Sequence, residues 1–167
     1  CLKSIIIPPS VKSIGDFAFL DCTSLYNIII PPSMEIIGSN SFDGCKNLNK
    51  ISIPSSIKYI GKGAFRNCSS LQKIKIPTSL TKIEENTFSE CSKLTRILIP
   101  ESIELIENKA FLNCSSLNEI KILSPTTLIA KDSFSGCSSL KTIIAHEELI
   151  TKFQSLLIEA KAVFESL

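Results

Sequence analysis

The sequence predicts a repeat solenoid in which short parallel strands stack along one axis, and three observations support this. First, a shift of 23 residues places cysteine on cysteine at Cys22, Cys45, Cys68, Cys91, Cys114 and Cys137. The same shift places leucine on leucine at Leu25, Leu48, Leu71, Leu94, Leu117 and Leu140. Third, proline recurs at Pro8, Pro31, Pro54, Pro77 and Pro100, and phenylalanine at Phe19, Phe42, Phe65, Phe88, Phe111 and Phe134. A fixed period of this length is typical of stacked units that bury one continuous core.

Each unit contains one clear strand, which is best seen after Leu71. The segment Leu-x-x-Ile-x-Ile ends in strict alternation and is rich in β-branched residues, which favours a short strand that includes Ile74 and Ile76. Pro77 ends the strand because proline cannot donate a hydrogen bond to a neighbouring strand. A short returning segment then carries Ile83, and a turn leads into the next unit. Side chains of these types should stack into apolar columns.

The two ends of the chain depart from the repeat. From Glu147 onward, apolar residues recur at spacings of three and four, which predicts an amphipathic capping helix. The residues in this pattern are Leu149, Ile150, Phe153, Leu157, Ala160 and Phe164. We therefore divide the chain into repeats over 1–145, in about seven units, and a helical cap over 146–167. Leu2 already occupies a strand position, so we expect an uncovered N-terminal edge that associates or continues into upstream repeats.

The repeat resembles the leucine-rich repeat, because Leu71, Ile74 and Ile76 fit its three strand positions and Ser79 falls where asparagine or cysteine usually stands. The 23-residue length, the Ile-Pro-x-Ser corner and the Phe-x-x-Cys-x-x-Leu ending make it similar to the BspA-like subfamily over roughly residues 1–145. The resemblance implies an α/β-type leucine-rich-repeat solenoid with strands on the concave face. It also implies irregular or short helical segments on the convex side. Members are mostly surface-exposed adhesins or antigens, and some bind extracellular host proteins.

Composition excludes some functions. The net charge of +2 gives no reason to expect nucleic acid or an anionic membrane as partner. Apolar runs such as Ile5 to Ile7 are too short to span a bilayer, so we expect no membrane insertion in this segment. No signal peptide is visible, but the chain opens on Cys1 within a repeat. The sequence therefore leaves the location open between the cell surface or secretion and, as the alternative, the cytoplasm.

The cysteine column has three interpretations. A zinc site would need converging pairs of the C-x₂₋₄-C type, which the sequence lacks. Disulfides between neighbouring units are compatible with the strand spacing, although in-register cysteines keep their Cβ atoms farther apart than a disulfide prefers. We favour buried free thiols that act as small apolar residues. Cys1 is out of register, and we expect it to be exposed and reactive.

The sequence gives little support for catalysis. The single histidine, His146, lies at the junction of the repeats and the cap, where a turn or capping role is favoured over acid–base chemistry. The chain has six glycines but no glycine-rich phosphate loop. We therefore predict a protein that is not an enzyme and has no catalytic, metal-binding or cofactor-binding residues.

The strand face is the candidate binding surface. Because side chains alternate along a strand, those between the buried residues must point outward. They form a basic cluster in the middle of the face and an apolar patch at its N-terminal end, and the basic side chains could equally be no more than a solvated face. The residues assigned to this surface are Lys50, Lys73, Lys75, Arg96, Lys121, Tyr26 and Ile29. Concave faces of solenoids commonly bind partners, so a partner with acidic groups is expected there.

We therefore predict a non-catalytic protein-binding module. By resemblance, it would be part of a larger surface protein that mediates adhesion through its concave face to a host or extracellular-matrix protein. The alternative is an intracellular scaffold or regulatory repeat domain that binds another protein of the same cell. The basic cluster lacks interleaved aromatic residues, which argues against nucleic acid.

Overall fold

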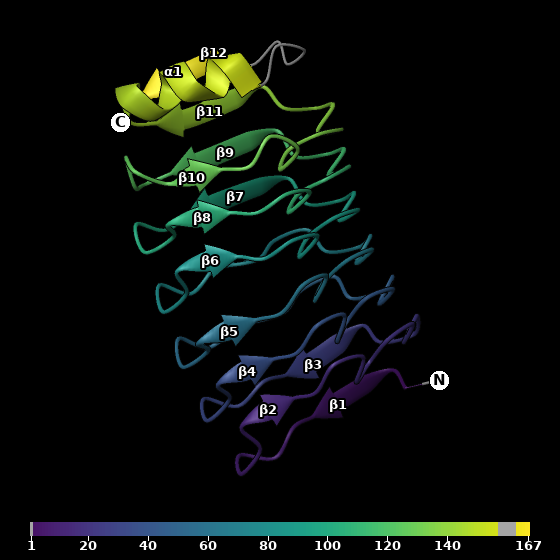
Figure 1. Ribbon diagram of the computed structural model, residues 1–167. Coiled ribbons are helices and arrows are strands. Elements are labelled where there is room, and N and C mark those ends of the chain that lie inside the picture. The colour runs from purple at the N-terminus through teal and green to yellow at the C-terminus, as the bar shows by residue number, and fades with distance from the viewer. Residues whose placement is uncertain (1, 157–162) are drawn as a thin grey trace.

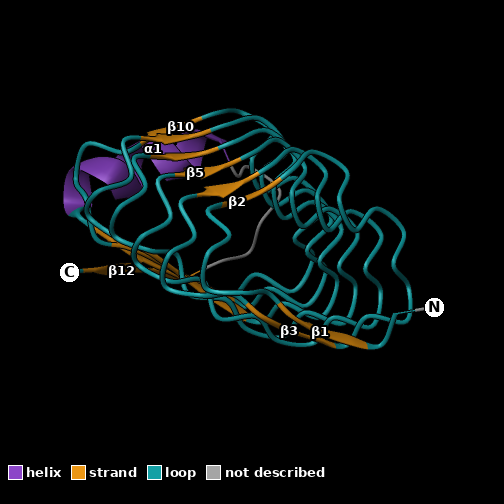
Figure 2. Ribbon diagram, turned by 90° about the horizontal axis from the view of Figure 1, so that it is seen from below, coloured by secondary structure: helices purple, strands orange, loops and turns teal. Residues whose placement is uncertain are grey.

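The computed structural model describes residues 2–156 and 163–167, which coil into a solenoid whose paired strands are all parallel (Figure 1). Two rows of strands lie on opposite sides of the coil (Figure 2). The first row contains β1 (Ser4–Ile6), β3 (Asn27–Ile29), β7 (Arg96–Ile99), β9 (Glu119–Ile122) and β11 (Thr142–Ala145). The second row contains β2 (Ser13–Ile14), β4 (Ile36–Ile37), β5 (Tyr59–Ile60), β6 (Lys82–Ile83), β8 (Leu105–Ile106) and β10 (Leu128–Ile129).

The first row confirms the strands predicted after Leu2, Leu25, Leu94, Leu117 and Leu140, whereas the segments after Leu48 and Leu71 that were also predicted as strands form only an isolated bridge. Its register joins equivalent positions of successive units, as in the pairing of Ser4 with Asn27 and of Arg96 with Glu119. Between β3 and β7 the row continues as a single parallel bridge from Lys50 to Lys73. Residues 23 apart in the sequence therefore occupy the same place in successive coils. Outward-facing side chains consequently form columns.

The proline corner of the first five units is a tight turn. The backbone N–H of Ile57 donates to the carbonyl of Pro54 at 3.2 Å, which closes the turn. The Ser56 hydroxyl donates to the carbonyl of Met34 in the preceding coil at 2.6 Å, which is the role expected of a corner hydroxyl. In the sixth unit, where the corner serine is replaced, Thr127 makes the equivalent bond to the preceding coil. The corner thus ties neighbouring coils together.

The second row lies on the side that the resemblance placed as convex. Its strands are only two residues long and are separated by turns, and residues 2–146 contain no helix. The row is divided into two sheets, ordered β2-β4-β5 and β10-β8-β6, so it is interrupted between β5 and β6. The short helical segments allowed by the resemblance are therefore absent from these repeats, and two-residue strands take their place.

The core consists of columns of stacked identical side chains. The phenylalanine rings from Phe19 to Phe134 stack with centroids 5.2–5.6 Å apart and planes within 17° of parallel. Leu48, Leu71 and Leu94 are fully buried, as the leucine column requires. Because every coil contributes the same residues, the core is continuous along the stack and each interior coil depends on two neighbours.

The C-terminal end is capped by a helix and a further strand. Helix α1 (Glu147–Leu156) lies over the last coil and buries Leu149, and two glutamates near its N-terminus complement its dipole (Figure 1). The helix predicted from the sequence reached Phe164, but β12 (Val163–Ser166) is a strand that pairs in parallel with β11. The difference arises because Val163 and Phe164 suit either structure, and the free edge of β11 offers backbone partners. Leu157 and Ala160 lie outside the described residues.

At the N-terminal end, β1 pairs with β3 on one side, and no strand of the described residues covers its other edge. Ile6 is 71% exposed and Phe17 is 55% exposed there.

Candidate functional site

The outward side chains of the first row define a surface that we call the strand face. Lys50, Lys73, Lys75 and Arg96 are exposed on it, and Lys121 is half-buried. The register places Lys50 opposite Lys73, and Lys121 beside Leu98 of β7. The structure thus brings the predicted basic residues onto one continuous surface.

The charges of the strand face are mostly unpaired. Lys50, Lys73, Lys75 and Lys121 form no salt bridge with any residue of the described ranges, whereas Arg96 lies 3.8 Å from Glu119. The remaining ion pairs lie away from this face. They are Lys58–Glu35, Lys62–Glu85, Arg66–Asp43, Lys82–Glu84 and Lys82–Glu107. Four lysines of the strand face therefore have no counter-ion within the described chain, as is also true of exposed lysines elsewhere such as Lys12 and Lys131.

One of those other ion pairs stabilises a turn. Asp43 is 5% exposed, and Nε and Nη2 of Arg66 both donate to its Oδ2, at 2.9 and 2.6 Å. This hydrogen bond raises the pKa of Arg66 further above its ordinary value. The pair has an internal structural role because its carboxylate is not accessible to a ligand.

Apolar side chains occupy the N-terminal end of the strand face. Ile6 of β1 pairs in register with Ile29 of β3, and both are more than half exposed. Tyr26 is also about half exposed, immediately before β3. The predicted patch is thus present, and further along the row Leu98 is exposed among the basic residues.

The cysteine column consists of free thiols. Cys45, Cys68, Cys91, Cys114 and Cys137 are buried, and each donates its S–H to the carbonyl of the phenylalanine 26 residues earlier, at 3.1–3.2 Å. Burial raises the pKa of Cys45 and of Cys137 to about 12, and it raises the pKa of the three thiols between them as well. Such thiols are structural and are poor nucleophiles. Cys22 differs because it is only half-buried at the open end of the stack, and Cys1 lies outside the described residues.

We expect one thiol to react in the folded Cys1→Ser variant and six to react after denaturation. Cys22 should react with a disulfide reagent in the native protein, while the five buried thiols should stay protonated and unreactive. A count with the reagent before and after addition of guanidinium checks this. Fewer than six thiols in the denatured, unreduced protein would instead indicate disulfides.

The raised thiol pKa values also predict a pH dependence of stability. In the unfolded chain these thiols ionise around their ordinary value of 9.0, whereas Cys45 and Cys137 hold their protons in the fold until about pH 12. Their contribution to folding is therefore complete below pH 9 and is lost as the pH rises from 9 toward 12. Urea midpoints measured across that range should fall, and they should fall less in the Cys45→Ala variant.

His146 is a capping residue, as its position indicated. Its Nε2 lies 3.0 Å from the carbonyl of Leu123, and its own carbonyl accepts hydrogen bonds from Leu149 and Ile150 in the first turn of α1. Within the described ranges, no three histidine, cysteine or acidic side chains gather as they would to hold a metal ion. A search of the same residues finds no helix that is long and apolar enough to cross a membrane.

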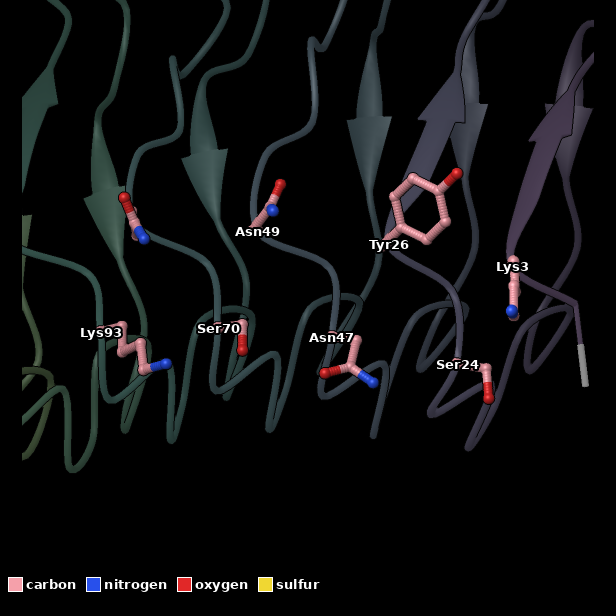
Figure 3. A pocket seen from close by; sticks show the side chains of 8 residues that line it. Lys3, Ser24, Tyr26, Asn47, Asn49, Ser70 and Lys93 are labelled. Carbon is pink, nitrogen blue, oxygen red and sulfur yellow. The ribbon is translucent and has the colours of Figure 1, made fainter.

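The structure also shows a polar hollow of about 530 Å³ that the sequence analysis missed (Figure 3). It lies beside the strand face, over the positions immediately before and after the buried leucines, as at Ser24 and Tyr26 around Leu25. The sequence signal was available, since these positions are polar in successive units. It was overlooked because the alternation within the strand begins only after them.

Comparison with known proteins identifies the repeat. The family model described as "BspA type Leucine rich repeat region" matches in 6 copies over residues 1–118 and 35–160. A leucine-rich repeat protein of T. pallidum is 25% identical, with a TM-score of 0.74 over 99% of this chain and 87% of that one. A leucine-rich cell surface protein of Faecalibacterium prausnitzii is 25% identical, with a TM-score of 0.56 over 85% of this chain and 59% of that one.

A leucine-rich repeat protein of Eubacterium ventriosum is 24% identical, with a TM-score of 0.69 over 84% of this chain and 44% of that one, and it supports the fold alone. The match to the F. prausnitzii cell surface protein spans only about three fifths of that protein's length. A search of curated proteins finds no match.

Proposed function

Because the chain belongs to the BspA-type leucine-rich-repeat family, we propose that it is a non-catalytic module that binds an acidic segment of another protein on its strand face. We further propose that this module is part of a larger surface protein, which it attaches to a host or extracellular-matrix protein. It is supported by the F. prausnitzii relative, which is described as a cell surface protein.

The observation that carries the proposal is the set of unpaired lysines. Lys50 and Lys73 are paired across neighbouring coils at a strand spacing of about 4.8 Å, and Lys75 follows two residues after Lys73 on the same coil. None of the three forms an ion pair in the described chain. Like charges this close repel one another. Acidic groups of a partner would relieve the repulsion, and the exposed Leu98 and Ile29 would add apolar contact. A rigid parallel stack presents these side chains without a cost of ordering loops.

The test is a charge reversal with a matched control. Lys73→Glu combined with Lys75→Glu should lower the affinity for a synthetic glutamate-rich peptide, and for any matrix protein that binds from an immobilised panel, by about tenfold or more. Lys12→Glu combined with Lys131→Glu makes the same change of net charge on exposed residues off the strand face, and should change the affinity by less than about twofold. Both variants should keep their stability within about 0.5 kcal/mol.

Equal losses in the two variants would mean that only net charge matters, which would contradict a site on the strand face. Unchanged binding in the first variant would exclude the strand face altogether. The location is tested separately with antibodies against this segment on intact and permeabilised source cells. Labelling that requires permeabilisation would favour an intracellular scaffold.

A further inference from the structure

The polar hollow beside the strand face is distinct in chemistry from the basic cluster. It spans the turns that lead into the strands of successive coils (Figure 3). Six neutral side chains line it, namely Ser24, Tyr26, Asn47, Asn49, Ser70 and Gln72. Lys3 also lines it from the first coil, and Lys93 lines it from a coil further along the stack. It is therefore a groove of amides and hydroxyls with a cation toward each end.

The repeat explains why so many polar groups gather there. Each buried leucine is flanked by one residue on either side that must face outward, as Asn47 and Asn49 flank Leu48. The next coil repeats the arrangement with Ser70 and Gln72 around Leu71. The stack thus sets two parallel columns of polar side chains along the hollow.

The hydrogen-bonding groups of the hollow are not used within the protein. Over the described residues, the side chains of Asn47, Asn49 and Gln72 make no hydrogen bond, and neither do the hydroxyls of Ser24, Tyr26 and Ser70. Lys3 and Lys93 form no ion pair in the same part of the chain. Amides offer donors and acceptors together, and hydroxyls do the same. This set suits a ligand rich in hydroxyl groups better than a uniformly acidic one.

Tyr26 adds an aromatic surface to the polar columns. Its ring is about half exposed and stands over the hollow (Figure 3). An amphipathic ring of this kind packs its face against apolar C–H groups while its hydroxyl stays hydrated. A sugar ring presents such a C–H face together with hydroxyls at its rim.

The spacing of the coils fits a glycan chain better than an extended peptide as the ligand of the hollow. Neighbouring coils lie about 4.8 Å apart at the strands beside the hollow, and the phenylalanine rings in the core stack 5.2–5.6 Å apart. An extended peptide advances only about 3.3 Å per residue, so its side chains fall out of step with the columns. A pyranose ring advances a glycan chain by about one coil step, so successive sugars meet equivalent amide pairs.

From this chemistry and spacing we propose that the hollow binds an acidic oligosaccharide. The ring of Tyr26 packs on one sugar, the amides of Asn49 and Gln72 bond to hydroxyls of the next ones, and Lys3 or Lys93 pairs with a carboxylate. The site shares Tyr26 with the apolar end of the strand face, but it contains none of the lysines that carry the proposed protein binding. Substitutions of those lysines and of the amides of the hollow therefore test the two proposals independently.

The test uses hyaluronan oligosaccharides, which carry a carboxylate on every second sugar, and chito-oligosaccharides of the same length as neutral probes. In calorimetric titrations, the unchanged protein should bind the hyaluronan probe more tightly than the neutral one. Asn49→Ala combined with Gln72→Ala should weaken binding of both probes by about tenfold or more, because their hydroxyls lose partners. Lys3→Gln combined with Lys93→Gln should lower the affinity for the hyaluronan probe severalfold and leave the affinity for the neutral probe unchanged.

The control is Lys73→Glu combined with Lys75→Glu, which lies on the strand face and should leave binding of the neutral probe unchanged. Absence of binding of either oligosaccharide at millimolar concentration would overturn the proposal. Full binding by the Asn49→Ala, Gln72→Ala variant would do so too. A glutamate-rich peptide that displaces the oligosaccharide from the hollow would instead identify it as part of the protein interface.

Discussion

Replacing Phe65 with alanine should lower the free energy of unfolding by about 3–5 kcal/mol, the range found when large aromatic side chains are truncated in a core. Phe65 is fully buried, and its ring stacks on Phe42 at 5.3 Å and on Phe88 at 5.6 Å. The substitution removes contacts on both sides and leaves a cavity between rigid coils. The backbone N–H of residue 65 donates to Thr87 of the next coil, so the coils cannot easily close the gap.

The matched control is Phe19→Ala, at the same repeat position. Phe19 is half-buried and stacks on Phe42 alone among the described rings, so its loss should cost clearly less. Urea unfolding followed by circular dichroism measures both. Equal losses for the two variants would show that the stack does not depend on neighbours on both sides, contrary to the fold described above.

The strand positions of the first row, the stacked columns and the inside and outside of each coil could be predicted from the sequence, because the repeat register fixes all of them. A residue at one repeat position is placed by the register opposite its equivalent in the next coil, as Lys50 is opposite Lys73. A single correct unit therefore determines most of the stack. The basic cluster could be predicted for the same reason, although what it binds depends on residues outside the repeat pattern.

The features that sequence reasoning missed depend on relations between neighbouring coils or on non-repeated segments. Strand β12 was not predicted because its four residues have no repeat equivalent, and its pairing is decided by the open edge of β11. The residue before each cysteine of the column has a positive φ, as at Asn67 and Gly136. Glycine or asparagine often stands at this position, and this preference could have been used to predict the left-handed turn. The polar hollow was missed because it emerges only when several coils are laid side by side.

Gly61 is expected to be required because the preceding coil lies against it, whereas Gly15, at the same repeat position, is expected to be dispensable. A Cβ added at Gly61 would lie 2.5 Å from the backbone nitrogen and 2.7 Å from the Cα of Ser39 in the preceding coil. Backbone atoms cannot rotate away, so Gly61→Ala must push the coils apart and strain the hydrogen bond from the Gly61 N–H to the Ile37 carbonyl. We expect a loss of about 1–3 kcal/mol, as for other overpacked sites.

Gly15 occupies the same repeat position in the first coil, and a Cβ there would meet nothing within 4 Å. Gly15→Ala should therefore be neutral, or stabilising by about 0.4–1 kcal/mol through the lower entropy of the unfolded chain. Urea midpoints of the two variants give the comparison, and a Gly61→Ala variant as stable as Gly15→Ala would refute it.

The chain itself carries a related substitution. Glu84 takes the glycine position in the coil after Gly61, and the second row of strands is interrupted there, between β5 and β6. Glu107 takes the same position one coil later, yet β6 and β8 remain paired, so a side chain at this position does not by itself separate two coils. In Gly61→Ala, any separation that the added Cβ causes should lie between β4 and β5. Faster amide hydrogen exchange at Tyr59 and Gly61, whose N–H groups bond to the preceding coil, would be the direct sign of that separation.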